Sequence, residues 1–251
     1  MNNPPDRDLA PRLPTWKRAL DLTAVAFAFP LLSLCAVSMF VLTSATSPGP
    51  LFFRQQRIGY RGRTFLLFKF RTMPVNVETD SHRAHIANLV HTNHPMEKMD
   101  NGRDPRLIPG GWLLRASGLD ELPQIINVLR GEMSLVGPRP CVPYEFELYD
   151  EAQRRRFDAM PGLTGLWQVS GKNHTTFQTM IELDVAYARK LSLWQDLRII
   201  VLTVPTVGGQ VIEAALNRLR LRPAAARSAA ALPARAMARS ATRNPSSIRI
   251  P

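Results

Sequence analysis

Cysteine is nearly absent from this chain of 251 residues. Its two copies, Cys35 in an apolar run and Cys141 after a Pro-Arg-Pro, lie far apart. Such a pair excludes a disulfide framework and a cysteine-rich zinc site, and it fits a reducing, cytosolic environment. The length excludes a large multidomain protein and allows one substantial core with extensions. We therefore expect one main domain.

Acidic residues are missing from the C-terminal segment. Residues 218–251 hold eight arginines and no Asp or Glu, which leaves 24 basic against 20 acidic residues upstream. The segment is rich in Ala, Arg, Pro and Ser and poor in large apolar residues, so it predicts a disordered tail. Its charge fits RNA, DNA, anionic lipid of the inner leaflet or plain solvation. Because the sequence lacks a basic ribbon studded with aromatics, zinc-finger spacing and a recognition-helix pattern, we expect no nucleic-acid partner.

A nucleotide-binding P-loop is also lacking. The segment GLWQVSGKN comes near one, but five residues rather than four separate Gly165 from Gly171. Asn173 also stands where the motif requires Ser or Thr. Phosphate binding in this chain therefore needs another arrangement of residues.

The histidines give little support for a metal site. Four of the five lie in a polar stretch over 78–103 with paired H-x-x-H spacing. No cysteine joins them, and the stretch has the composition of a surface insertion, which is the interpretation we favour over a metal site. The four are His82, His85, His91 and His94.

What the chain does have is an uncharged run of 21 residues, Leu22 to Leu42. As a helix it would be about 31 Å long, close to the hydrocarbon thickness of a bilayer. Pro30 favours a kink inside it. Basic residues flank both ends, starting with Lys17 and Arg18, whereas a single span carries them mainly on its cytoplasmic side. The pattern fits a re-entrant membrane helix over 17–46 and an ordinary span equally well, with a cleaved signal peptide and a buried core helix as further alternatives.

The rest of the chain reads as a mainly helical α+β domain at the membrane surface. The segments LFFRQQR, IGYRG and RTFLLFKFRTM predict a small β-hairpin. Apolar residues at helical spacing predict a helix from Leu119 to Arg130, with Ser117 as its N-cap and Gly131 at its C-terminal end.

The segment PGLTGLWQVSGKN reads as turn, strand and loop, and residues 177–204, just ahead of Pro205, read as mostly helical. The predicted organisation is an N-terminal extension over 1–16, the membrane helix over 17–46, a cytoplasmic domain over 47–210 and the tail.

Two adjacent acids, Asp120 and Glu121, fall in the first turn of the predicted helix, on or beside the polar stripe that holds Gln124. Free backbone N–H groups and the helix dipole favour anions there. A carboxylate that attacks a diphosphate needs a divalent cation or basic side chains to offset charge repulsion. The alternative is that the pair are ordinary first-turn acids and the basic residues are solvated. The candidate basic residues are Lys69, Arg71, Arg106, Arg115, Arg139 and Lys172.

Several ordered segments together resemble one family. They are KRALDL, SPGPLFFRQQRIGYRGRTFLLFKFRTM, DPRLIPGGWLLR, LDELPQIINVLRGEMSLVGPRP, PGLTGLWQVSGKN and LDVAYARKLSLWQDLRIIVLT. Over about residues 17–205 the chain resembles the bacterial sugar transferases, the monotopic phosphoglycosyl transferases. Within them it is similar to the undecaprenyl-phosphate galactose phosphotransferases of exopolysaccharide synthesis. The resemblance implies an enzyme of the bacterial inner membrane that faces the cytoplasm and is held by a re-entrant helix. It would move a phospho-sugar from a UDP-sugar to undecaprenyl phosphate and release UMP.

The resemblance also implies residue roles. Asp120 would be the nucleophile that forms an aspartyl phospho-sugar intermediate, and Glu121 with Asp120 would hold Mg²⁺. Lys69, Arg115 and Arg139 match basic positions expected around the phosphates, and Arg71, Arg106, Gln124 and Lys172 complete the predicted substrate-binding set.

Three positions depart from the family pattern. Phe29 precedes Pro30 where Ser is common, Gly118 stands in place of the usual Ser, and Lys172 replaces Arg. The donor sugar and the oligomeric state are not encoded in these motifs, and UDP-galactose and UDP-glucose are the nearest analogies. A non-catalytic membrane adaptor with a recruiting tail and a nucleic-acid-binding membrane protein are the rival hypotheses.

Overall fold

The computed structural model describes residues 13–75, 106–171 and 175–240, with side chains described as far as Leu216. Helices predominate, and four short strands form two separate pairs. This architecture confirms the predicted mainly helical α+β class with a small hairpin. The histidine-bearing insertion and Lys172 lie outside the described residues.

The N-terminal apolar run forms α1, Thr15–Thr46, a single helix of 32 residues. It is long and apolar enough to cross a membrane. The helix passes Pro30 without interruption, so the predicted break between two helical halves is not seen. One proline removes a single backbone donor, which the many remaining hydrogen bonds of a long helix outweigh. Large apolar side chains on its middle are exposed, among them Phe27, Leu34 and Phe40.

The first two turns of α1 are packed into the domain. Lys17 is 1% exposed, and its Nζ donates to the Val136 carbonyl at 2.9 Å and forms an ion pair with Asp196 at 2.6 Å. Arg18 donates through Nη1 to the Val128 carbonyl at 2.6 Å. Lys17 and Arg18, which the sequence placed as basic flanks of the apolar run, therefore bind groups of the globular domain.

The predicted hairpin is confirmed as β1, Phe52–Ile58, and β2, Thr64–Phe70, which pair antiparallel from Phe52 opposite Phe70 to Ile58 opposite Thr64. The turn contains η1, Tyr60–Gly62, where Gly62 has a φ of 73°. Leu67 and Phe70 face the core beside α1, together with Ile125, Val128 and Met133.

The predicted helix over 119–130 is split into a 3₁₀ segment, η2, Leu119–Gln124, and an α-helix, α4, Ile125–Leu129. It follows α3, Gly111–Ser117, through Gly118 with a φ of 72°. The prediction of Ser117 as N-cap is wrong: the N-cap is Gly118, and the Ser117 hydroxyl donates to the Leu113 carbonyl at 2.8 Å within α3. Gly131 does end the helix, with a φ of 75°.

The second strand pair brings two loops into contact. Strands β3, Ser134–Val136, and β4, Gly162–Thr164, run parallel, and only β4 was predicted. A Cβ on Gly162 would lie 2.0 Å from the Gly137 nitrogen, so both positions require glycine for close backbone approach. The elements between and after them are α5, Pro143–Phe146; α6, Glu151–Arg154; η3, Arg155–Asp158; α7, Leu166–Val169; and α8, Phe177–Arg189.

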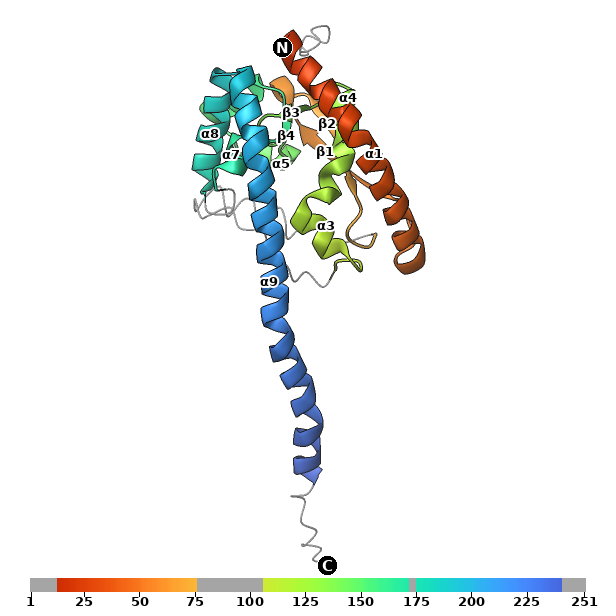
Figure 1. Ribbon diagram of the computed structural model, residues 1–251. Helices are drawn as coiled ribbons and strands as arrows, with labels where there is room; N and C mark the ends of the chain where they lie inside the picture. Colours follow the sequence, from red (N-terminus) through yellow and green to blue (C-terminus); the bar gives the residue numbers. More distant parts are fainter. Residues whose placement is uncertain (1–12, 76–105, 172–174, 241–251) are drawn as a thin grey trace, which may run out of the picture.

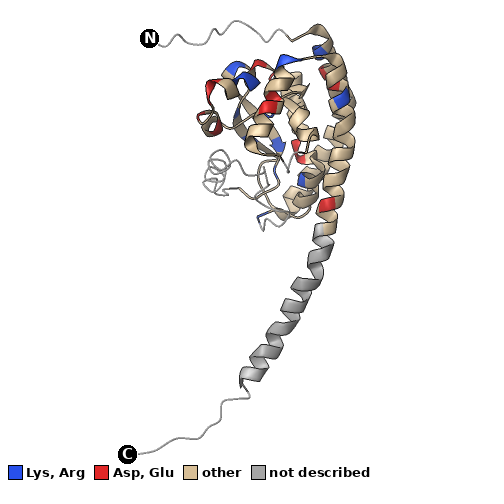
Figure 2. Ribbon diagram, turned by 90° about the vertical axis from the view of Figure 1, so that its left-hand side faces the viewer, with Lys and Arg blue, Asp and Glu red and all other residues tan. Residues whose placement is uncertain are grey.

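The last helix, α9, Leu193–Ser240, starts close to the N-terminal end of α1 and diverges from it (Figure 1). The helix continues through Pro205 without interruption, although the sequence predicted that the helical segment would end just before this proline. Its backbone is helical into the predicted tail as far as Ser240, and the disorder predicted for 218–251 stays a prediction. Figure 2 shows α1 and α9 on one side of the molecule, with the short elements and most of the ribbon coloured for charged residues on the other. Residues 193–216 of α9 also form a segment long and apolar enough to span a membrane.

Candidate active site

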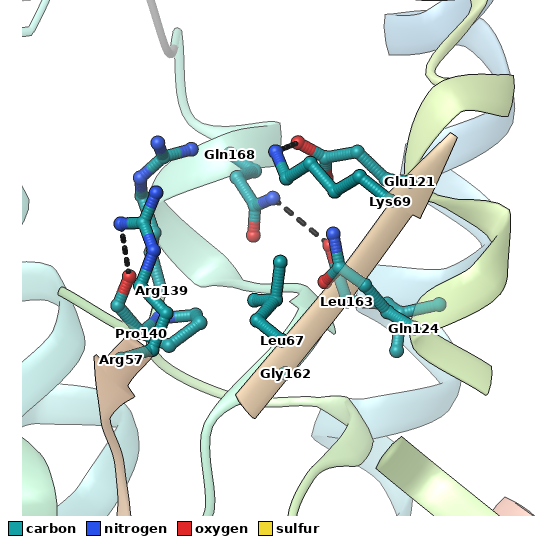
Figure 3. A pocket seen from close by; sticks show the side chains of 10 residues that line it. All are labelled: Arg57, Leu67, Lys69, Glu121, Gln124, Arg139, Pro140, Gly162, Leu163 and Gln168. Atoms are coloured by element: carbon teal, nitrogen blue, oxygen red, sulfur yellow. Dashed lines mark hydrogen bonds and ion pairs between the residues drawn. The ribbon is translucent and has the colours of Figure 1, made fainter. Parts of the chain in front are cut away.

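A cavity lies between the β1–β2 hairpin, η2, the loop after β3 that carries Arg139, and the segment from Gly162 to Gln168. Its polar lining comes from both sides, with the aliphatic side chain of Leu67 between them (Figure 3). One side is formed by η2 and β2, and the other by β1 and the loop after β3. The charged and amide residues that line it are Arg57, Lys69, Glu121, Gln124, Arg139 and Gln168.

The first side carries the acidic pair. Lys69, on β2, forms an ion pair with the Glu121 Oε1 atom of η2 at 2.7 Å (Figure 3), and both side chains are partly exposed. Asp120 precedes Glu121 in the same first turn and is buried. Gln124, one turn further along η2, is also buried and lines the cavity. Lys69, predicted to contact the substrate phosphates, thus lies beside the acidic pair, and Glu121 rather than Asp120 is the acid that lines the cavity.

The second side carries two arginines. Arg57, at the end of β1, is 6% exposed, and its Nη1 donates to the Pro140 carbonyl at 3.1 Å while its Nη2 donates to Gln55 Oε1 at 2.7 Å. Arg139, in the GPRP segment, lines the cavity next to it (Figure 3). Burial, and next the positive charge of Arg139, lower the pKa of Arg57 to about 10. This side of the cavity therefore concentrates positive charge.

A buried network holds the GPRP segment in place. Arg156 is 1% exposed and donates through Nη2 to the Arg139 carbonyl at 2.9 Å. It also donates through Nη1 to the Tyr149 hydroxyl at 2.7 Å and forms an ion pair with Asp184 of α8. Because these contacts fix the backbone of Arg139, the side chain projects from a rigid support.

Gln168 of α7 forms part of the cavity lining between the two sides (Figure 3). Its Nε2 donates to the Leu163 carbonyl at 3.0 Å, which orients the amide. Its Oε1 is buried and has no hydrogen-bond partner. A buried acceptor without a donor is costly, so this oxygen is suited to accept a hydrogen bond from a bound molecule.

Three predicted basic residues do not line the cavity. Arg71 is buried after β2, where its guanidinium binds the Ser47 hydroxyl at 2.9 Å and the Pro50 carbonyl at 2.8 Å. These contacts tie the end of α1 to β1 and indicate a structural role in place of the predicted substrate contact. Arg106 and Arg115 lie before η2 and are also absent from the lining.

Sequence reasoning missed Arg57 and Gln168. A signal was available for Arg57, because this charged residue stands next to last in a strand whose final residue, Ile58, is part of the core. Gln168 lies inside the quoted PGLTGLWQVSGKN motif, but no sequence pattern there distinguishes a functional glutamine from an ordinary polar residue. Both reach the cavity only through long-range contacts, including the bridge between Ile58 and Cys141.

The residues present fit a hard divalent cation supported by few protein ligands. Within the described ranges no group of three or more His, Cys, Asp or Glu side chains lies together. Mg²⁺ commonly binds one or two carboxylates and completes its shell with water and substrate phosphates. The adjacent carboxylates of Asp120 and Glu121 meet that requirement.

Comparison with known proteins agrees with the motifs. The model of a family described as bacterial sugar transferase matches residues 13–210. The chain is 40% identical over 194 residues to a galactosyl transferase of Streptococcus agalactiae, covering 76% of this chain and 42% of the relative. It is 39% identical over 191 residues to an exopolysaccharide production protein of Sinorhizobium fredii, covering 76% and 84%.

A third relative is the undecaprenyl-phosphate galactose phosphotransferase of Salmonella typhimurium, 38% identical over 165 residues that cover 63% of this chain and 33% of the relative. The chain thus spans less than half of two of these relatives and most of the third. Because the family match covers the membrane helix, the cavity and the start of α9, it includes every element of the site. The chain therefore belongs to the bacterial sugar transferase family and is an enzyme, a phosphoglycosyl transferase.

Proposed function

We propose that the protein transfers a phospho-sugar from a UDP-sugar to undecaprenyl phosphate and releases UMP, as the first membrane step in the synthesis of an exopolysaccharide or another glycoconjugate. One observation carries this proposal: Glu121 of η2 lines a cavity together with Lys69, Arg57 and Arg139, and Asp120 precedes it in the same turn. Carboxylates opposite several cations suit the chemistry of a diphosphate.

Relatives support the substrate class. One is named UDP-galactose-lipid carrier transferase, from Erwinia amylovora, and another UDP-glucose:undecaprenyl-phosphate glucose-1-phosphate transferase, from Xanthomonas campestris. Both names describe a nucleotide sugar as donor and a lipid carrier as acceptor, which is the reaction class that the proposal assigns to this chain. The two names differ in the sugar, so a panel of UDP-sugars is needed to identify the donor.

The proposed reaction has two displacements at one phosphorus. An oxygen of the Asp120 carboxylate attacks the phosphorus that bears the sugar, and the bond to the bridging oxygen breaks, so that UMP leaves with the electron pair. An oxygen of the lipid phosphate then attacks the same phosphorus and displaces the carboxylate. The second step regenerates Asp120 and yields a lipid diphosphate sugar.

The side chains around the cavity have distinct tasks in this scheme. Asp120 and Glu121 would hold Mg²⁺, which supplies positive charge to the phosphate oxygens when bound. Lys69 keeps the Glu121 carboxylate oriented through their ion pair at 2.7 Å. Arg139 reaches the cavity from a backbone fixed by Arg156, and it offsets negative charge on the diphosphate.

Membrane attachment through α1 brings the site to its lipid substrate. The exposed apolar side chains of α1 fit a hydrocarbon environment, and the first turns are anchored in the domain by Lys17. We propose that α1 enters the cytoplasmic membrane from its inner leaflet, with the domain in the cytoplasm. The arginines from Arg218 onward follow the apolar part of α9 and would attract anionic headgroups.

The test is release of UMP by purified full-length protein given a panel of UDP-sugars, Mg²⁺ and a polyprenyl phosphate. UMP release that requires both a matching UDP-sugar and the divalent ion is the expected result. Full turnover in the presence of a chelator would show that the reaction does not need the divalent ion. If no UDP-sugar of the panel yields UMP, the rival hypothesis of a non-catalytic membrane adaptor replaces the proposed reaction.

A further inference from the structure

Two arginines lie next to each other on one side of the cavity. Figure 3 shows the guanidinium groups of Arg57 and Arg139 close together, across the cavity from the ion pair of Lys69 and Glu121. Arg57 approaches from the end of β1 and Arg139 from the loop after β3. Their neighbourhood is therefore built by two segments that are distant in the sequence.

No ion pair in the described part of the chain includes Arg57 or Arg139. Ion pairs there join Lys17 to Asp196, Lys69 to Glu121 and Arg156 to Asp184. Glu145 and, more weakly, Glu121 favour the charged form of Arg57, but Glu145 accepts a hydrogen bond from the Tyr149 hydroxyl and Glu121 is paired with Lys69. The buried guanidinium of Arg57 and the half-buried one of Arg139 repel each other, and a bound anion would reduce that cost.

The guanidinium of Arg57 is oriented for a ligand. Bonds to the Pro140 carbonyl at 3.1 Å and to Gln55 at 2.7 Å hold its two terminal nitrogens. Its Nε is buried and has no hydrogen-bond partner. Planar guanidinium groups bind phosphate oxygens through paired N–H donors. Arg57 therefore combines a fixed plane, an unused Nε–H donor and a charge that forms no ion pair within the described residues.

We propose that Arg57 and Arg139 together form the binding site for the phosphate that lies opposite the carboxylates of η2 during each displacement. This inference rests on the proposed function and adds to it a substrate-binding residue and a position. In-line transfer places the attacking and leaving oxygens on opposite sides of the reacting phosphorus. If Asp120 acts from the η2 side, the leaving phosphate of UMP occupies the arginine side, and the phosphate of the lipid enters the same place once UMP has left.

Binding of two monophosphates by variant proteins tests this site. The probes are UMP and a short-chain, water-soluble polyprenyl phosphate, each titrated into full-length protein in detergent. Arg57→Gln removes the charge and the planar donors, and we expect it to raise the Kd of both ligands by at least about tenfold, as for loss of charge-assisted hydrogen bonds. Arg57→Lys keeps the charge without the plane and is expected to lie between Arg57→Gln and the unchanged protein.

Arg54→Gln is the matched control. Arg54 lies on the same strand, is exposed and packs over the Phe68 ring instead of lining the cavity. We expect it to leave both Kd values within about twofold of the unchanged protein, since a distant exposed charge acts weakly through solvent. Thermal unfolding of all three variants shows whether a change in Kd reflects the site or the fold.

The outcomes of the titrations support or overturn the shared phosphate site. Weaker binding of both phosphates by folded Arg57→Gln, with Arg54→Gln unaffected, supports the shared site. Unchanged binding of both would overturn it, and a loss confined to one ligand would overturn the claim that the two phosphates share a position. If Arg57→Gln does not fold, Arg57→Lys carries the same comparison. Failure of the unchanged protein to release UMP from any UDP-sugar defeats the proposed function, whereas these binding titrations still report on the anion site.

Discussion

Two buried basic residues in the interior of the domain form ion pairs, whereas the arginines on the second side of the cavity form none with any described residue. Lys17 and Arg156 are each 1% exposed, and each forms an ion pair with a buried aspartate, Asp196 and Asp184 respectively. On the second side of the cavity, Arg57 is nearly as buried, yet no carboxylate among the described residues forms an ion pair with it or with Arg139.

Charges of the first kind connect elements that are far apart in the sequence. Lys17 joins α1 to β3, α8 and α9 through bonds to Val136, Tyr187 and Asp196. Arg57 and Arg139 of the cavity remain available to bind the negative charge of a ligand. The difference separates basic residues that hold the fold together from those that we assign to the substrate.

Breaking an interior pair should have the largest effect on stability. Lys17→Met leaves Asp196 buried without its cation, and loss of one partner of a buried pair costs about 3–5 kcal/mol. We expect the midpoint of thermal unfolding in detergent to fall by about 6–20 °C. The double variant Lys17→Met, Asp196→Leu removes both charges and should recover most of the loss, whereas a double variant as unstable as the single one would contradict a pairwise role.

Disturbing the close backbone approach of Gly137 and Gly162 should have the next largest effect on stability. In Gly162→Ala the new methyl would lie 2.0 Å from the Gly137 nitrogen, so the loop that carries Arg139 must move. We expect a loss of about 1–3 kcal/mol, together with loss of UMP release.

The control for this change is Gly208→Ala in α9, where no atom lies within 4 Å of the added methyl. It should stabilise the helix by up to about 1 kcal/mol and leave transfer unchanged. Equal destabilisation by both variants would show that the close approach of the loops is not the cause.

Removing a cation from the cavity should change activity far more than stability. The Lys69 and Glu121 side chains are 19% and 31% exposed, so Lys69→Met should cost no more than about 1 kcal/mol of unfolding free energy. Transfer should fall by about 10²-fold or more, because a positive charge near the reacting phosphates is lost. Parallel measurements of thermal unfolding and UMP release check this, and a large drop in stability with little loss of transfer would place Lys69 with the interior charges.

The smallest effect concerns Cys141, which is 1% exposed beside the GPRP segment. Burial, and next the charge of Glu145, raise the pKa of its thiol to about 12. In a Cys35→Ser background, we expect no reaction with a thiol reagent at pH 8 until denaturant is added. Because the folded thiol stays neutral while the unfolded one ionises, its contribution to stability is present below pH 9 and is lost between pH 9 and pH 12. Rapid labelling of the folded protein at pH 8 would show that the cavity region opens readily.

Local patterns were enough to predict the parts of the fold that depend on neighbours in the sequence. Strand patterns predicted the hairpin of β1 and β2, and Gly131 ended the helix as expected. The apolar stripe predicted for this helix is confirmed at Ile125 and, as partly buried residues, at Leu122 and Ile126, whereas its fourth member, Leu129, is 52% exposed. The first turn around Asp120 became a 3₁₀ segment, because it starts directly from Gly118 at a positive φ.

Features that depend on tertiary contacts were beyond the sequence patterns. Lys17 lies 179 residues from Asp196, so its neighbours suggested a membrane flank and only the folded chain pairs it. Arg71 and Lys69 looked equivalent in KFRTM, yet one binds the end of α1 and the other binds Glu121. Arg57 gained its position from the Ile58–Cys141 bridge, which local spacing does not encode.

The covalent step at Asp120 is the claim that one measurement tests most directly. Full-length protein is incubated with a UDP-sugar labelled at the phosphate next to the sugar, with Mg²⁺ and without any lipid phosphate. We predict release of about one equivalent of UMP and transfer of the label to the protein, with neither event in Asp120→Asn. If UMP appears only after the lipid phosphate is added and the protein never carries label, both substrates react directly and the proposed intermediate does not exist.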